Sequence, residues 1–408
     1  MSAPSAKFLE QLQREAQATS RIKVRTLATV EKEKRDPDFE SRLLASMDIT
    51  DGPQAASAKK DIRKALREAR KTIPTPTEDF NSHVIMKHLA RQLGKAARQQ
   101  KRNLRSMPVY GSLPVGQLNA RAIRVPESGE HLIAFHYGVF AFVNLLTKAV
   151  AASFRLKRTS SDGELSEFSW KVRDFKRSWA KDDEPLRRLG ECLCAYLVVG
   201  DANQADQYFV QAPFHLPAFI LRESFELFLF GHELGHILAG HLSRSHDVRQ
   251  GFGNIEVEAF EAENWQMEFE ADSIGMDLAI QAMLNNHCDF VNSYCGVDMA
   301  FSAMEIVDLA NSTLIHGEPR PAPSSKSHPR HAVRRAFLRE LLRQRLGKRA
   351  AKQPIKLGET LEEVLHQMWR HLEPQFKALH GEGERPSPIW APWRPTRALS
   401  RPHSASRE

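Results

Sequence analysis

The sequence predicts an α+β fold that is mainly helical, with a small β-sheet in the first half of the chain. Three observations indicate this class. Most apolar residues recur with the three-to-four-residue period of helices, and alternation is confined to about residues 106–136. Hydrophobic residues also make up 41% of the 408 residues, which is enough for a real core in one large or two ordinary domains.

The charge balance favours a soluble surface with basic tails. The formal net charge is +8, but 50 acidic residues accompany the 58 basic ones, so nucleic acid is not a predicted partner. The spacing of the four cysteines fits no zinc ribbon. We expect Cys192, Cys194, Cys288 and Cys295 to be reduced thiols in a cytoplasmic protein.

Neither secretion nor a membrane span is predicted. Residues 1–16 lack the apolar core of a signal peptide. The nearest approach to a span is residues 133–152, but His136, Asn144 and Lys148 interrupt its apolar run.

A charged, helical N-terminal region is expected over residues 1–105. Residues 58–72 and 82–105 have a helical pattern, and Pro74 and Pro76 break the chain between them. The second helix ends in basic residues, where cations suit the helix dipole. A basic helix of this kind is more often a solvated face than a nucleic-acid contact.

Two strands are predicted in the β-region. Residues 120–125 alternate, residues 126–129 turn, and residues 131–136 return, followed by an apolar helix over 138–152. If 131–136 forms the edge of the sheet, it can hold an extended substrate through main-chain hydrogen bonds. A polar insert is expected at about 157–183.

The chemistry of the chain centres on residues 225–242, which read FELFLFGHELGHILAGHL. On a helix, His232 and His236 lie on one face and can bind one metal ion. Glu233 is the next residue on the helix after His232, where its carboxylate can take a proton from a metal-bound water, as in zinc hydrolases. Burying these polar groups in an apolar helix is costly unless something satisfies them. The small residues Gly235 and Ala239 permit the close approach of a second helix.

The third ligand is expected from a second helix over residues 257–284. Glu268 lies on one stripe with Asp272, Gly275 and Ala279, so it can complete a site of two histidines and one glutamate. Asp272 can accept a hydrogen bond from a ligand imidazole. The alternative is that the glutamates of this helix form a solvated acidic face. His241 falls on another face of the first helix, and we expect it to be structural.

These motifs resemble those of the gluzincin metallopeptidases. HExxH at 232–236 is followed by ExxAD at 268–272, by Ser327-His328-Pro329, and by Arg334 six residues after His328. The clan of membrane CAAX-processing and heat-shock-induced proteases shows this series. The soluble phage-exclusion proteases of the Lit type are the most similar, and the likeness covers about residues 110–345.

The resemblance implies a zincin-like metallopeptidase domain over about residues 106–350. One Zn²⁺ per chain would be bound by His232, His236 and Glu268, with Glu233 as general base. His328 would stabilise the oxyanion or bind substrate, and Arg334 would pair with an acidic group such as Asp272.

The residues after the Ser327-His328-Pro329 motif also predict secondary structure. A helix is expected from Pro329 to about Leu346. A C-terminal helix is expected within 351–381, with its amphipathic part over 360–379, before a disordered tail over 382–408.

The resulting hypothesis is a zinc endopeptidase that cuts an intracellular protein, with a role in phage defence or stress response. One alternative is a metal-binding regulator of the phage-repressor or DNA-damage type. Such regulators carry a helix-turn-helix, and residues 1–105 contain no convincing one. The other alternative is an inactive scaffold in which the metal only holds the fold. The sequence predicts neither the substrate, nor the trigger, nor the oligomeric state.

Overall fold

The structure is a computed structural model, and it describes residues 4–20, 22–41, 52–126, 128–158, 166–242, 254–321 and 329–387. Packing divides these residues into two compact units. The N-terminal unit contains residues up to 91 and 105–139, and the C-terminal unit contains residues 92–104 and those from 140 onward. The domain boundaries expected from the sequence remain a prediction.

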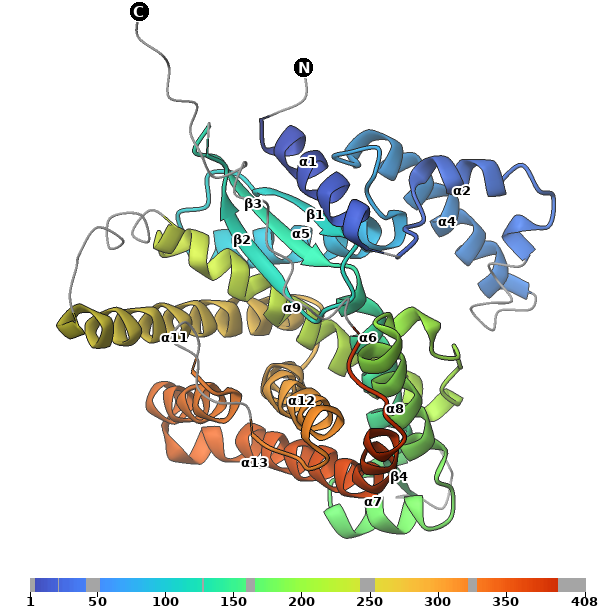
Figure 1. Cartoon of the computed structure of the whole chain (residues 1–408), viewed down its shortest axis with the longest axis vertical. Coiled ribbons are helices and arrows are strands. Elements are labelled where there is room, and N and C mark those ends of the chain that lie inside the picture. The colour runs from blue at the N-terminus through green and yellow to red at the C-terminus, as the bar shows by residue number, and fades with distance from the viewer. Residues whose placement is uncertain are drawn as a thin grey trace, which may run out of the picture. The chain divides into compact units, whose positions relative to one another are not determined.

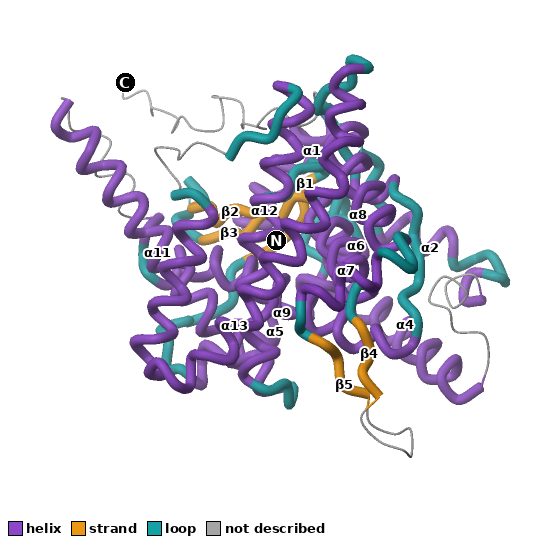
Figure 2. The backbone as a smooth tube through the Cα atoms, turned by 90° about the horizontal axis from the view of Figure 1, so that it is seen from below, coloured by secondary structure: helices purple, strands orange, loops and turns teal. Residues whose placement is uncertain are grey.

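The expected fold class is confirmed. Helices dominate, and the described strands form one mixed sheet of three strands and one sheet of two strands (Figures 1 and 2). No helix among the described residues is both long enough and apolar enough to cross a membrane.

Among the described residues, the helices of the N-terminal unit are α1 (Pro4–Thr19), α2 (Leu27–Glu33), α4 (Gly52–Thr72) and the first part of α5 (Phe80–Gln99). The α1 helix packs Leu9 and Leu12 against Leu113 and Leu132 of the sheet. The α2, α4 and α5 helices share a second apolar cluster.

The α5 helix ends at Gln99 and not at residue 105, so that part of the prediction is wrong. Lys101 has a φ of 54° and turns the chain out of the helix. The N–H of Lys101 donates to the carbonyl of Arg98, and that of Arg102 donates to the carbonyl of Ala97. These two bonds form a Schellman motif, which closes the helix before the basic residues that were expected to lie inside it.

The three-stranded sheet contains β1 (Val109–Leu113), β2 (Ala120–Arg124) and β3 (His131–His136) in the order β1-β3-β2. The predicted pair is present, since β2 and β3 are antiparallel, while β1 runs parallel to β3. The condition for main-chain binding of a substrate, that residues 131–136 form the sheet edge, is not met, because β3 is bonded on both sides. Its continuous apolar run, Leu132–Phe135, is buried on both faces, which is typical of a central strand.

A buried carboxyl group, Glu78, fixes the loop between α4 and α5 to the sheet. It accepts hydrogen bonds from the backbone N–H and the hydroxyl of Ser112, at 2.9 and 2.8 Å, and from the side chain of Gln13 at 2.6 Å. Burial raises the pKa of Glu78 to about 8, although these donors favour the charged form. The folded N-terminal unit therefore keeps a proton that the unfolded chain releases near pH 4.5.

The first prediction concerns stability against pH. Between pH 4.5 and about 8 the folded state binds more protons at Glu78 than the unfolded state, so the free energy of unfolding should fall as pH rises. Glu78→Gln should flatten this slope in denaturant unfolding of the full chain at pH 5, 6, 7 and 8. Glu31→Gln, at a surface pair with Arg70, should keep the slope. A slope that Glu78→Gln leaves unchanged would contradict the assignment.

The C-terminal unit is built almost entirely from helices. Its elements are α6 (Gly138–Ala152), β4 (Arg155–Arg158), β5 (Ser166–Ser169), α7 (Val172–Trp179), α8 (Glu184–Cys194) with a π-helical extension (Ala195–Val199), two 3₁₀ turns (Ala202–Gln204 and Ala212–Phe214), α9 (His215–Leu238), α11 (Asn254–Asn285), α12 (Phe290–His316) and α13 (His331–Gly381).

The segment expected as a polar insert is anchored in the core. Strands β4 and β5 pair as antiparallel neighbours, and residues 159–165 between them lie outside the described residues. Phe175 and Trp179 of α7 are buried, and the indole N–H of Trp179 donates to the hydroxyl of Ser153 at 2.9 Å.

The α13 helix is two helices joined at a kink. Gly347 has φ 77° and ψ 156°, which interrupts the helix directly after the predicted end at Leu346. The second part begins immediately after this glycine and ends at Gly381, so the C-terminal helix expected within 351–381 starts before the amphipathic part expected over 360–379. The tail beyond residue 387 lies outside the described residues.

Glycines allow α9 and α11 to lie in close contact, as the small residues Gly235 and Gly275 led us to expect. A Cβ atom at Gly275 would lie 2.7 Å from the backbone nitrogen of His232, and one at Gly235 would lie 2.8 Å from the carbonyl oxygen of Ala271. Gly231 adds a contact that the sequence did not single out, since its Cβ would lie 3.0 Å from the carbonyl oxygen of Gly275. Only residues without a Cβ fit at these positions with the helices this close.

Candidate metal centre

The two histidines of the HELGH motif point to the same place from one face of α9. His232 is buried and His236 is half-buried. Their Nε2 atoms are 3.2 Å apart, and the two rings are nearly perpendicular, at 89°. This is the arrangement that the four-residue spacing predicts for two ligands of one ion.

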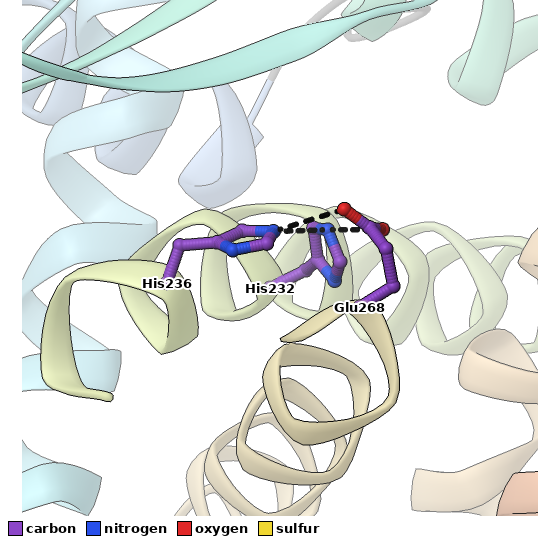
Figure 3. A group of neighbouring side chains, drawn as sticks. All are labelled: His232, His236 and Glu268. Atoms are coloured by element: carbon purple, nitrogen blue, oxygen red, sulfur yellow. Dashed lines mark hydrogen bonds and ion pairs between the residues drawn. The ribbon is translucent and has the colours of Figure 1, made fainter. Parts of the chain in front are cut away.

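Glu268 reaches the same place from α11, as Figure 3 shows. Its carboxylate oxygens lie 3.5 Å from Nε2 of His232 and 3.4 Å from Nε2 of His236. Glu268 is buried, with 6% of its surface exposed, so it does not belong to a solvated acidic face. The structure thus brings together the three residues predicted as metal ligands.

The spacing of these atoms fits a metal ion. Bonds of about 2.0–2.1 Å in tetrahedral directions place neighbouring ligand atoms about 3.3 Å apart. Here the two Nε2 atoms are 3.2 Å apart, and those of His232 and His236 lie 3.5 and 3.4 Å from different oxygens of the Glu268 carboxylate. The group could therefore hold one ion and leave a fourth position for another molecule.

A buried ion pair orients His232. Arg334 of α13 donates from Nε and Nη2 to the two carboxylate oxygens of Asp272, at 2.7 and 2.6 Å. Asp272 in turn lies 2.9 Å from Nδ1 of His232. The pairing expected between Arg334 and Asp272 is thus present, and Arg334 also lies 3.4 Å from Glu268.

The charges of this ion pair set the protonation of the groups around it. Burial alone would raise the pKa of Asp272, but the adjacent guanidinium of Arg334 holds it below its usual value. Burial alone would lower the pKa of His232, but its hydrogen bond to Asp272 raises it. A neutral His232 that donates its Nδ1–H to Asp272 keeps the Nε2 lone pair for a metal.

His241 contacts the predicted ligand His236, a role that the sequence reasoning missed. Its Nδ1 lies 2.9 Å from Nδ1 of His236, and its Nε2 lies 3.0 Å from the carboxylate of Glu270. Helical spacing does not predict this contact, because α9 ends at Leu238. Gly240, with a φ of 73°, turns the chain so that His241 returns toward His236. A glycine just after a helical run was the signal for this turn.

Of the two predicted catalytic residues, Glu233 lies among the described residues and His328 does not. Glu233 is buried on α9 directly after His232, and its negative charge helps to raise the pKa of Arg334. Ser327 and His328 lie outside the described residues, so the structure does not place the predicted oxyanion contact.

A second group with metal-ligand spacing, Glu305, Glu362 and His366, is an ion-pair network. Arg335 pairs with Glu305 and with Glu362, each at 2.6 Å. Arg339 lies 2.8 Å from Glu362. Because two guanidinium groups already neutralise these carboxylates, the group needs no metal ion.

No protein-family model, curated protein or solved structure matches this chain. The likeness to gluzincins consequently rests on the motifs and on the geometry of the residues that form the centre.

The second prediction concerns the metal itself. Purified protein should contain about one metal ion per chain, and His232→Ala together with His236→Ala should remove it, because Glu268 alone holds metal weakly. Elemental analysis measures the content. His366→Ala in the ion-pair network should retain the full amount. Full retention in the double variant would exclude this centre.

The third prediction concerns His241. His241→Phe keeps an aromatic ring but removes the contact with His236, so metal affinity should fall by about 10–100-fold. Competition with a chelator at fixed pH measures this change. Glu270→Gln should give a smaller loss, since an amide oxygen can still accept from His241. An affinity equal to wild type in His241→Phe would show that the contact does not support the centre.

Proposed function

We propose that this protein is a zinc-dependent endopeptidase that cleaves a protein substrate. The observation that carries the proposal is the convergence of His232, His236 and Glu268 within hydrogen-bonding distance, directly beside Glu233. The likeness of the motif series to gluzincins supplies the reaction class, hydrolysis of peptide bonds.

Zinc is the metal that best fits this set of donor atoms. Two imidazole nitrogens and one carboxylate are a ligand set of catalytic zinc sites, which keep three protein ligands and one open position. When bound, zinc polarises a carbonyl group and lowers the pKa of water.

The residues of the chain supply the rest of the chemistry. Glu233 is proposed to take the proton from the attacking water and to pass it to the leaving amine. Asp272 and Arg334 fix the ring of His232, and the glycine contacts fix the distance between α9 and α11. His328 is proposed by likeness alone as the group that stabilises the oxyanion.

Two features favour an enzyme over a scaffold whose metal only holds the fold. Structural zinc sites are closed by four protein ligands, whereas the group found among the described residues offers three. The side chain of His236 is 16% exposed, so the centre lies close to solvent. A metal-binding regulator would use the same three ligands but would not depend on Glu233.

The fourth prediction separates these functions. Glu233→Gln keeps the size of the side chain but cannot accept a proton, so zinc content should stay near wild type. Cleavage should fall by about 10²–10⁴-fold, the worth of a positioned general base. Proteomics of newly formed protein termini, in cells that express wild type or Glu233→Gln, measures the difference.

Glu340→Gln is the matched control, since it changes an exposed glutamate of α13 that pairs with Arg343 and has no proposed role at the centre. If wild type and Glu233→Gln produce the same termini, the endopeptidase proposal fails. A regulator or a scaffold would then explain the metal-ligand group.

A further inference from the structure

A patch of cations and aromatic rings lies where α6 meets the N-terminal part of α9. We call it the α6–α9 patch, and it consists of Asn144, Lys148, Phe209, Phe219 and Arg222. Asn144 and Lys148 are one turn apart on α6, and Arg222 of α9 donates to the side-chain oxygen of Asn144 at 3.3 Å. Phe209 and Phe219 are 46% and 47% exposed, which is unusual for rings of this size.

Each cation of the patch lies beside one of these exposed rings. Nζ of Lys148 is 5.9 Å from the centre of the Phe209 ring, and the guanidinium of Arg222 is 5.7 Å from that of Phe219. The patch therefore offers positive charge and apolar surface next to each other.

The two positive charges lack a carboxylate partner. Lys148 and Arg222 are both half-buried, and within the described ranges neither forms an ion pair. Burial and the charge of Arg222 lower the pKa of Lys148. Nε of Arg222 is buried and has no hydrogen-bond partner among the described residues. Such an arrangement is unfavourable by itself, and an anion placed between the cations would stabilise it.

Glu226, one turn after Arg222 on α9, does not neutralise the patch at neutral pH. Only 3% of Glu226 is exposed, and burial raises its pKa to about 8 despite the charge of Arg222. Its carboxyl group is therefore mostly protonated below that pH.

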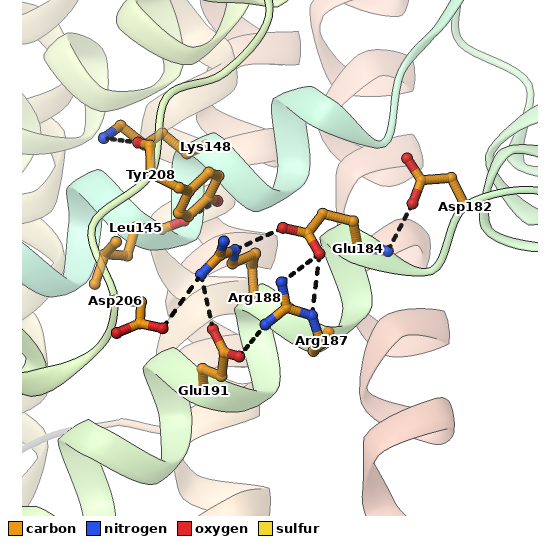
Figure 4. A network of polar contacts seen from close by, with 9 residues as sticks. All are labelled: Leu145, Lys148, Asp182, Glu184, Arg187, Arg188, Glu191, Asp206 and Tyr208. Carbon is orange, nitrogen blue, oxygen red and sulfur yellow. Dashed lines mark hydrogen bonds and ion pairs between the residues drawn. The ribbon is translucent and has the colours of Figure 1, made fainter. Parts of the chain in front are cut away.

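The carboxylates of neighbouring α8 are engaged elsewhere, as Figure 4 shows. Glu184 and Glu191 pair with Arg187 and Arg188, and Asp206 lies 3.9 Å from Arg188. None of these acids contributes to the pKa of Lys148.

Lys148 is held in place before any ligand binds. Its ammonium donates to the carbonyl oxygen of Tyr208 at 2.8 Å, and the Tyr208 ring lies between Lys148 and Arg188. The Tyr208 hydroxyl donates to the carbonyl of Leu145 at 3.3 Å (Figure 4). An ammonium has three N–H donors, and the structure uses one of them here. A cation fixed in this way loses little entropy on binding an anion.

The patch lies on the same face of α9 as Glu233. From residue 222 to residue 233 is eleven residues, which is close to three turns of the continuous helix α9. The distance along the helix is about 16 Å at about 1.5 Å per residue. An extended peptide covers that distance in about five residues.

We propose that the α6–α9 patch is a subsite for an acidic side chain of the protein substrate, about five residues from the cleaved bond. Lys148 and Arg222 bind the carboxylate, and Phe209 and Phe219 pack against apolar atoms beside it. The position of the bond rests on the endopeptidase proposal, whereas the binding of the acid does not.

Binding is tested without cleavage, in the full-length Glu233→Gln protein. The probes are two pools of fluorescein-labelled, C-terminally amidated decapeptides, one with glutamate and one with glutamine at a central position and mixed residues elsewhere. The glutamate pool should bind about 5–10-fold more tightly, as one charge-assisted contact allows, and less so at high salt. A third pool, with glutamine at the centre and a free C-terminal carboxylate, should bind like the glutamine pool.

Arg222→Gln and Lys148→Gln should each reduce the preference for the glutamate pool. Arg343→Gln, at a surface arginine of α13 that pairs with Glu340, should keep it. Equal binding of the two pools, or a preference that survives both substitutions, would overturn the subsite. Preference for the third pool would instead assign the patch to a chain terminus and overturn the side-chain proposal.

Cleavage tests the position of the subsite. Peptides from a digested proteome are incubated with the active protein, and the cut sites are aligned. Aspartate and glutamate should be enriched four to six positions from the cut bond, and Arg222→Gln should cut without this enrichment.

The two proposals can fail separately. Cutting without acidic enrichment would overturn the subsite and leave the endopeptidase. Absence of cutting, together with a retained preference for the glutamate pool, would overturn the endopeptidase and support an anion site of a different function.

Discussion

The close contact of α9 and α11 is the constraint on which the candidate centre depends. The histidines come from one helix and Glu268 from the other, so the separation of the helices sets the distance between the ligand atoms. Backbone meets backbone at Gly231, Gly235 and Gly275. A side chain at any of these positions would push the helices apart by more than a metal–ligand bond tolerates, since such bonds vary by only about 0.2 Å.

Arg334 joins a third helix to this contact. A buried ion pair adds little net stability, because the desolvation of both charges offsets their attraction. Its two hydrogen bonds to Asp272 instead fix the orientation of the carboxylate that accepts from His232. The pair thus acts on the geometry of the centre more than on the stability of the fold, and His241 acts on His236 in a corresponding way from the end of α9.

The sequence predicted the features that depend on the helical spacing of side chains. It did not predict the features that depend on the residue at which a helix ends. The four-residue spacing of His232 and His236 and the stripe that carries Glu268 both depend on helical repeat, and the structure brings these residues together. The end of α5 at Gln99 and the return of His241 depend on single residues with positive φ, which periodicity does not detect. The position of β3 in the middle of its sheet depends on β1, whose sequence VYGSL does not alternate between apolar and polar residues.

Lys148 and Asn144 are polar residues in an apolar segment, and the sequence and the structure suggest different roles for them. In the sequence they interrupt a hydrophobic helix and argue against a membrane span. In the structure they form a stripe on α6, one turn apart, and Asn144 contacts Arg222 of α9. Keeping two cations there, half-buried and without a carboxylate partner among the described residues, costs stability that a neutral pair would avoid. Such a cost at a site on the same face as Glu233 is better explained by recognition of a ligand than by folding.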